Sequence, residues 1–218
     1  MKKKEAFEKL YRLAERQLGC FTASQAQSCG YSPQAQYHHV QAGDWVRVAR
    51  GICCLKYFPT PVRVDLMICY LWTCDRNDVP QGVFSHETAF SLHPYSVWRP
   101  TEKHITVPRS FRRRGAPPEP VRLYKRDLDK SDVTIIEWVA VTKPVRTVVD
   151  LLMSGFVQQH HLRDFVRTSL EMGIITHRNM SETRLSLDEW EQLVGLLKRI
   201  NYDRIEDIQV WSGIRETA

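Results

Sequence analysis

Apolar residues recur at helical spacing near the start of the chain, and a glycine ends the first such stretch. Residues 5–18 predict an amphipathic helix with one apolar stripe turned inward. That stripe consists of Phe7, Leu10, Tyr11, Ala14 and Leu18. Gly19 is expected to end the helix, since glycine adopts the left-handed conformation without steric cost.

Two further helices are predicted directly downstream. Thr22 and Gln25 fit a capping box, which satisfies two free backbone donors at the start of a helix, and Gly30 should end that helix. Ser32 followed by Pro33 predicts another helix start, because proline at the first helical position loses no hydrogen bond. The spacing therefore indicates three short helices in succession.

A two-stranded ribbon is predicted to follow the third helix. This helix should run to about Ala42 and end at Gly43, and residues 45–55 then alternate apolar and other side chains around Gly51. Three helices and a hairpin, in this order, are typical of a winged helix-turn-helix. Residues 1–57 are therefore predicted to form a DNA-binding domain.

The remainder of the chain, residues 62–218, predicts a second domain beyond a seam around residues 58–61. Helices and strands are mixed there without regular alternation, so the fold class is α+β: an N-terminal winged helix-turn-helix followed by a mixed α+β C-terminal domain. Helices are expected over 62–74 (with a buried strand as the alternative), 85–92, 142–152, 157–172 and 187–200. The last of these should begin with a capping box formed by Ser186 and Glu189. Strands are expected over 103–107, 121–124 and 133–141.

The third helix is the predicted reader of base sequence, since the corresponding helix of this motif lies in the major groove. Ala35, Tyr37 and Val40 suit its inner side. The outer positions are Gln34, Gln36, His38, His39 and Gln41. Glutamine can pair through two hydrogen bonds with adenine. Either base contact or ordinary solvation could explain this polar row.

Basic residues near this helix are predicted to bind phosphates, which position a protein on DNA without reading its sequence. Arg47 and Arg50 lie on the ribbon, and Lys2, Lys3 and Lys4 open the chain. Residues 1–57 hold nine Lys/Arg and four Asp/Glu, a net of +5 out of +6 for the whole chain. This concentration of charge favours binding to double-stranded promoter DNA.

A second cluster of positive charge follows in the C-terminal part, where residues 99–126 hold nine Lys/Arg and two Asp/Glu, a net of +7. We refer to its core as the second basic patch: Arg109, Arg112, Arg113, Arg114, Lys125 and Arg126. It could add DNA backbone contacts, hold RNA or an acidic partner, or be a solvated loop.

Other classes of protein find little support. No run of eighteen apolar residues and no apolar signal core are present, so a soluble, cytoplasmic protein is expected. The six cysteines lack a C-x2-C spacing, which argues against a standard zinc site, and we expect them to be buried reduced thiols. No metal and no cofactor are predicted.

No catalytic residues are predicted either. Phe90 stands where a zinc-protease helix beginning at His86-Glu87 would need its second histidine. Glu137 is followed by Trp138-Val139 and therefore lacks the lysine of an acid-x-Lys metal nuclease. The expected protein is not an enzyme.

Four blocks of residues, in order, resemble the AbiEi family of antitoxins from type IV toxin–antitoxin systems. The first resembles the family's winged-helix domain: Leu13-Ala14-Glu15-Arg16-Gln17, Gly19, Phe21-Thr22-Ala23, Gln25-Ala26, Gly30-Tyr31-Ser32, Gly43, Trp45, Arg47 and Arg50-Gly51. The other three resemble its C-terminal domain: Ser85-His86-Glu87-Thr88-Ala89, His104-Ile105-Thr106-Val107-Pro108, and Val141-Thr142 with Arg146-Thr147 and Asp150-Leu151.

The resemblance implies a DNA-binding antitoxin that represses its own operon at inverted repeats and takes part in phage defence. It also implies a functional partner, a nucleotidyltransferase toxin, which the C-terminal domain counteracts without necessarily forming a stable complex. The residues leave two alternatives open. The first is a winged-helix transcriptional regulator with a sensor C-terminal domain and no toxin partner. The second is a nuclease or a subunit of one, against which the missing lysine argues.

Overall fold

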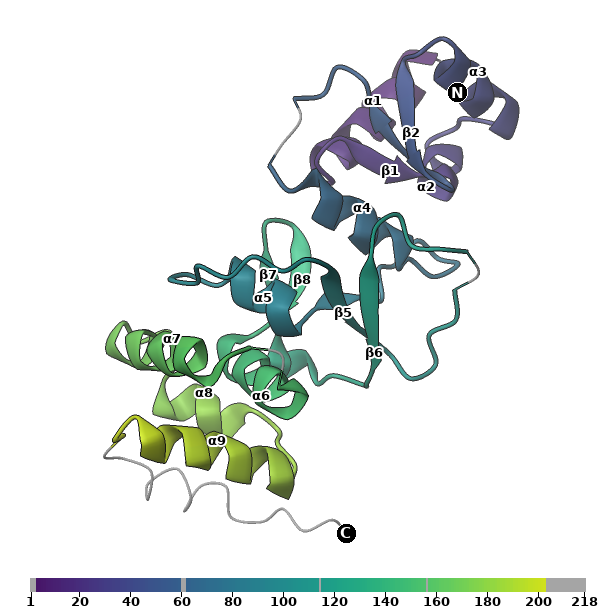
Figure 1. The fold of residues 1–218 in the computed structure, drawn as a ribbon. Coiled ribbons are helices and arrows are strands. Elements are labelled where there is room, and N and C mark those ends of the chain that lie inside the picture. The colour runs from purple at the N-terminus through teal and green to yellow at the C-terminus, as the bar shows by residue number, and fades with distance from the viewer. Residues whose placement is uncertain (1–2, 60–61, 114, 156, 203–218) are drawn as a thin grey trace. The chain divides into compact units, whose positions relative to one another are not determined.

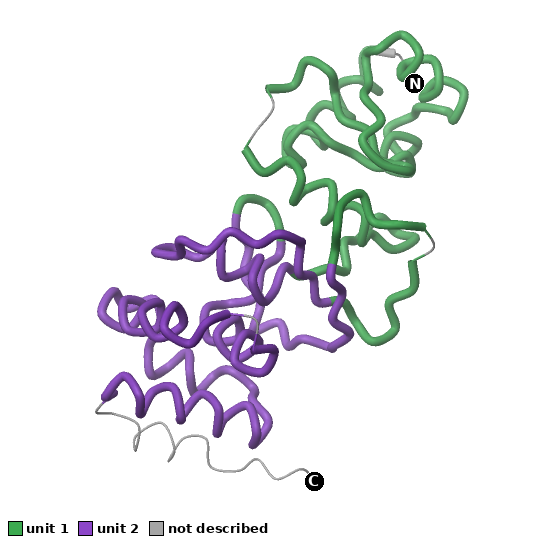
Figure 2. The backbone as a smooth tube through the Cα atoms, viewed as in Figure 1, with its two compact units in different colours: residues 1–83, 107–121, 137–139 green, residues 84–106, 122–136, 140–218 purple. Residues whose placement is uncertain are grey.

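The chain folds into two compact units in a computed structural model (Figure 2). The structure describes residues 3–59, 62–113, 115–155 and 157–202. Unit 1 comprises residues 1–83, 107–121 and 137–139, and unit 2 comprises residues 84–106, 122–136 and 140–218. The two units do not divide at residues 58–61, because each unit combines segments that are far apart in the sequence. The domain boundary at residues 58–61 therefore stays a prediction.

Unit 1 begins with three helices and a two-stranded ribbon in the predicted order, and with one strand, β1, that was not predicted (Figure 1). They are α1 (Lys3–Glu15), β1 (Cys20–Thr22), α2 (Ala23–Ser28), α3 (Pro33–Gln41), β2 (Trp45–Ala49) and β3 (Ile52–Leu55). The strands form an antiparallel sheet in the order β1-β3-β2. Helix α4 (Val64–Trp72) follows, so the helical alternative for this stretch is correct.

The predicted helix starts are confirmed in this unit. The Thr22 hydroxyl accepts from the backbone N–H of Gln25, and the Gln25 side chain accepts from the Thr22 N–H, which completes the capping box of α2. Ser32 caps α3 by accepting from the Ala35 N–H, and Pro33 takes the first helical position. Local sequence therefore fixes where α2 and α3 begin.

The inward face of α1 differs from the predicted stripe. Leu10 and Ala14 are buried as expected, but Phe7 is 54% and Tyr11 41% exposed, so the prediction for these two aromatics was wrong. Ala6 takes the inner place instead, because spacing of four residues aligns it with Leu10 and Ala14. Small side chains on this face let α1 approach the core closely.

The oxidation state predicted for the cysteines was also wrong for one pair. Cys20 and Cys54 form a disulfide, since β1 and β3 pair antiparallel and bring these two residues opposite each other, with Cα atoms 4.0 Å apart. The other four are reduced thiols, of which Cys29, Cys69 and Cys74 are buried and Cys53 is half-buried. Without a prediction of β1, this pairing could not be foreseen.

Most of a five-stranded sheet lies in unit 2, while a terminal residue of some strands is counted in unit 1. Its order is β6-β5-β4-β8-β7, and β4 pairs in parallel with β8. The strands are β4 (Val83–Phe84), β5 (Lys103–Val107), β6 (Val121–Lys125), β7 (Val133–Ile136) and β8 (Val139–Thr142). The single strand predicted over 133–141 was wrong: Glu137 and Trp138 have positive φ and turn the chain between β7 and β8.

Helices of unit 2 enclose an apolar core beside this sheet. They are α5 (His86–Leu92), α6 (Pro144–Ser154), α7 (Gln159–Glu171), α8 (His177–Glu182) and α9 (Leu187–Arg199), with a 3-10 turn at Lys130–Asp132. The core they share includes Phe90, Val148, Leu151, Leu162, Phe165 and Leu196. The capping box predicted at Ser186 and Glu189 is present, whereas α8 was not predicted.

A buried ionic network joins α6 to α9. Arg146 is fully buried, and its Nη2 lies 2.8 Å from an oxygen of Asp150 and 2.8 Å from an oxygen of Glu189. Glu189 also accepts two hydrogen bonds from Arg126. Because a lone buried charge is very unfavourable, these two carboxylates are what allow a guanidinium inside the unit.

The pKa values of the two carboxylates in this network are shifted in opposite directions. Burial raises the pKa of Asp150 to about 6 despite the neighbouring Arg146 guanidinium. Burial also opposes ionisation of Glu189, but hydrogen bonds from Arg126, Arg146 and the Ser186 backbone outweigh it and lower its pKa to about 2. Glu189 is therefore the carboxylate that holds the network together.

No helix among the described residues is both long enough and apolar enough to cross a membrane.

Reduction of the Cys20–Cys54 disulfide should destabilise the protein. The bridge closes a loop across a sequence separation of 34, and the chain-entropy model gives about 3–4 kcal/mol for a loop of this length. Urea unfolding with and without dithiothreitol measures the difference. A double variant, Cys20→Ser with Cys54→Ser, should show no further effect of the reductant; equal unfolding of oxidised and reduced wild type would contradict the bridge.

Substitution Glu189→Gln should lower the free energy of unfolding by about 3 kcal/mol or more, because it removes one of the charges that compensate buried Arg146. The depressed pKa adds a pH dependence: Glu189 stabilises the fold above its ordinary value of 4.5, and this contribution is lost as pH falls toward 2. The difference between wild type and variant should therefore shrink over that range. Glu191→Gln, exposed on the same helix, is the matched control and should change little.

Candidate nucleic-acid interface

One face of α3 is exposed and polar. Gln34, Tyr37, His38 and Gln41 are exposed and follow the spacing of a single helical face, whereas Ala35 and Val40 pack against the unit 1 core. Tyr37 was assigned to the inner side by the sequence analysis, and that assignment was wrong: it is 57% exposed. The face available for a groove thus combines two amides, an imidazole and a phenol.

Gln36 holds α3 in place. Its side-chain nitrogen donates to the backbone carbonyls of Ala23 and Tyr31, at 3.0 Å each, and so ties α3 to the start of α2 and to the turn between the helices. Pairing with adenine through two hydrogen bonds would require the same nitrogen. In this structure Gln36 therefore positions the predicted reading helix, and its part in base contact stays a prediction.

His39 packs toward the ribbon. Its ring stacks on Trp45 with centroids 4.9 Å apart and lies edge-on to Tyr31. Its Nδ1 is 2.9 Å from a carboxylate oxygen of Asp44, and this contact is an ion pair only if the imidazole is protonated. His38, one residue earlier, is on the exposed face. The two histidines thus occupy different surroundings, and contact with DNA is untested for both.

The ribbon carries the predicted phosphate-binding arginines at exposed positions. Arg47 lies on β2 opposite Cys53, and Arg50 lies in the turn before Gly51, whose φ of +76° closes the hairpin. Burial raises the pKa of the Cys53 thiol, an effect that Arg47 opposes. Lys4 is exposed on α1, which begins at Lys3. A ribbon with exposed guanidinium groups suits contacts with a DNA backbone.

The described residues of the second basic patch are divided between the two units. Arg112 Nη1 donates to the carbonyls of Arg109 and Phe111, and Arg113 Nη1 donates to the Cys74 carbonyl, all within unit 1. Lys125 and Arg126 belong to unit 2, where Arg126 binds Glu189. Arg114 lies outside the described residues. Arg126 therefore acts in the buried network, a role that the sequence reasoning missed because Glu189 is 63 residues away.

This arrangement suits the binding of a nucleic-acid duplex. A helix with exposed hydrogen-bonding side chains suits the major groove, and the adjacent ribbon supplies cations for phosphates. Among the residues that the structure describes, no group of three or more His, Cys, Asp or Glu could hold a metal ion. Tyr37 was the residue missed by sequence reasoning, although its spacing from Gln34 and Gln41 gave the signal.

Comparison with known proteins agrees with this geometry for the N-terminal domain. No curated protein matches the chain. The match that is found covers the helix-turn-helix and its ribbon, from α1 to β3, and it is to a family of regulators. Over residues 8–55, the chain matches the family of transcriptional regulators described as AbiEi antitoxins.

Proposed function

We propose that this protein is a DNA-binding antitoxin that represses its own toxin–antitoxin operon. The observation that carries the proposal is the exposed polar face of α3 beside the arginines of the ribbon, within the segment that matches the AbiEi family. Such a helix reads base edges while the ribbon holds the backbone. A repressor of this kind acts on promoter DNA in the cytoplasm.

We further propose that the C-terminal part counteracts a nucleotidyltransferase toxin, as part of a type IV system with a role in phage defence. The resemblance to AbiEi antitoxins in three blocks supports this proposal, and the three blocks meet in unit 2. The backbone N–H of His104 donates to the Thr88 hydroxyl at 2.8 Å. His93 Nε2 lies 2.8 Å from the Thr142 carbonyl and so links the helix of the first block to the third.

Arg109, Arg112 and Arg113 are proposed as further contacts to the DNA backbone. They stand close together in sequence, in a segment that belongs to unit 1 together with the helix-turn-helix. Charge alone does not select DNA over RNA or an acidic protein, so salt-dependent binding of each must be compared.

Titration of promoter DNA in a mobility-shift assay tests the repressor directly. The upstream promoter should be retained at a lower protein concentration than a scrambled duplex of equal length, over a range of salt concentrations. Equal affinity for both duplexes would remove the proposed repressor function. Co-expression with an adjacent nucleotidyltransferase gene then separates the antitoxin from the alternative, a regulator with a sensor domain, because only an antitoxin should restore growth.

The variants Arg47→Ala and Arg50→Ala should each weaken binding to promoter and scrambled DNA equally. A phosphate contact releases counterions, so each variant should reduce the slope of log K against log salt by about one. Fluorescence anisotropy at several salt concentrations measures both quantities. Arg167→Ala, an exposed change on α7, serves as the control and should leave the slope unchanged. A variant that loses affinity only for the promoter would instead indicate base contact.

The variants Gln34→Ala and Gln41→Ala should reduce the preference for the promoter over scrambled DNA. Loss of one good base contact costs about 1–3 kcal/mol of discrimination, while the salt slope should stay as in wild type. Gln192→Ala, exposed on α9, is the matched control. An undiminished promoter preference in both glutamine variants would show that other residues read the sequence.

A further inference from the structure

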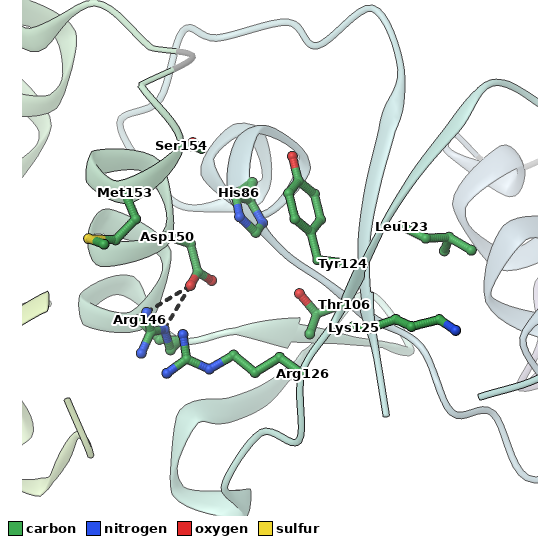
Figure 3. Close-up of a pocket in the computed structure, with 10 residues that line it drawn as sticks. All are labelled: His86, Thr106, Leu123, Tyr124, Lys125, Arg126, Arg146, Asp150, Met153 and Ser154. Atoms are coloured by element: carbon green, nitrogen blue, oxygen red, sulfur yellow. Dashed lines mark hydrogen bonds and ion pairs between the residues drawn. The ribbon is translucent and has the colours of Figure 1, made fainter. Parts of the chain in front are cut away.

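A pocket of about 470 Å³ opens on the surface of unit 2. This size is within the range of small-molecule sites. Side chains from α5, β5, β6 and α6 surround it (Figure 3). They are His86, Thr106, Leu123, Tyr124, Lys125, Arg126, Arg146, Asp150, Met153 and Ser154. The pocket lies entirely within one packing unit.

An unpartnered acceptor lies at the inner end of this pocket. Asp150 is 95% buried, and its Oδ1 accepts from the Arg146 Nε at 2.9 Å, but its Oδ2 is buried without a hydrogen-bond partner among the described residues. Figure 3 shows this second oxygen turned away from Arg146, toward the open space beside His86 and Tyr124. A buried acceptor without a donor is costly, so a ligand that supplies an O–H or N–H would be favoured here.

An unpartnered donor accompanies this acceptor. Arg146 also lines the pocket, and its Nη1 is buried without a hydrogen-bond partner among the residues described. The charges themselves are already matched, because Arg126 and Arg146 face Asp150 and Glu189. A cationic ligand group would disturb that balance, whereas a neutral group that can both donate and accept would satisfy it.

The walls of the pocket suit a ring-shaped molecule. His86 and Tyr124 stack on each other with centroids 3.6 Å apart, and burial above all lowers the pKa of His86 to about 3, which keeps the ring uncharged. Met153 lies on the α6 side, across the space from Tyr124, while Lys125 and Leu123 extend away from it in Figure 3. Aromatic and thioether surfaces favour contact with a flat or cyclic ligand.

We propose that this pocket binds a ribose-bearing ligand, a nucleoside or a nucleotide, through hydrogen bonds from the ribose hydroxyls to Asp150. A carboxylate that accepts from ribose hydroxyls is a recurrent way of holding nucleotides. Ribose hydroxyls are neutral and donate to an acceptor such as Asp150 Oδ2.

Isothermal titration calorimetry with the full chain tests the proposal. The probes are adenosine, guanosine, cytidine and uridine, their 5′-monophosphates, free ribose and 2′,3′-dideoxyadenosine. At least one nucleoside or nucleotide should bind at millimolar concentration. If adenosine binds, the dideoxy compound should bind at least tenfold more weakly. If another nucleoside binds instead, it is compared with its own 2′,3′-dideoxy form. Comparison of the nucleosides with their 5′-monophosphates shows which of the two classes of ligand the pocket binds.

Two variants locate the binding. Asp150→Asn replaces the buried carboxylate with an amide. Met153→Trp narrows the pocket and leaves the ionic network unchanged, because the Met153 side chain is exposed and is not part of that network. Each should weaken binding at least tenfold, while Asp164→Asn, exposed on α7, should not. Thermal unfolding of Met153→Trp should match wild type, which separates a blocked pocket from a damaged fold.

Three outcomes would overturn the proposal: no binding of any nucleoside or nucleotide, equal binding of the dideoxy compound, or full binding by Met153→Trp. None of these outcomes affects the mobility-shift result. Failure of the pocket and failure of the proposed repressor function can therefore be distinguished.

Discussion

The buried guanidinium of Arg146 is the constraint on which unit 2 depends. Its charge has to be balanced inside the fold, and two carboxylates from different helices do so, Asp150 one turn later and Glu189 on α9. Apolar packing alone could slide one helix past another, whereas paired charges hold a defined register. The same network also leaves two polar atoms without partners. Structural support and the capacity to bind a ligand thus arise from the same side chains.

In unit 1, the residues that position α3 and the residues that α3 leaves exposed lie on opposite sides of this short helix. Gln36 ties α3 to the preceding turn, and His39 packs on Trp45 of the ribbon, so the orientation of the helix is set by its own polar residues. Gln34, Tyr37 and His38 are consequently left for a partner. A helix of nine residues has little stability alone, and these contacts supply the rigidity that base recognition requires.

Local signals in the sequence predicted much of this fold. Capping boxes at Thr22 and Ser186 and the Ser32-Pro33 helix start depend on residues three apart or fewer, and all three are present. Features that depend on distant partners were missed. Among them, the pairing of Cys20 with Cys54 requires β1, a strand of three residues, which is too short to show any periodicity.

In the candidate site, too, features set by local sequence were predicted and features that depend on distant residues were missed. The exposure of Arg47 and Arg50 on the ribbon was predictable, because arginine side chains are rarely buried without a partner. The role of Arg126 was not, since a run of basic residues looks uniform until a carboxylate far along the chain pairs with one of them. A charge count therefore overstates the positive surface available to nucleic acid. Arg126 acts instead at the border between the ionic network and the pocket, where the same guanidinium can stabilise the fold and face a ligand.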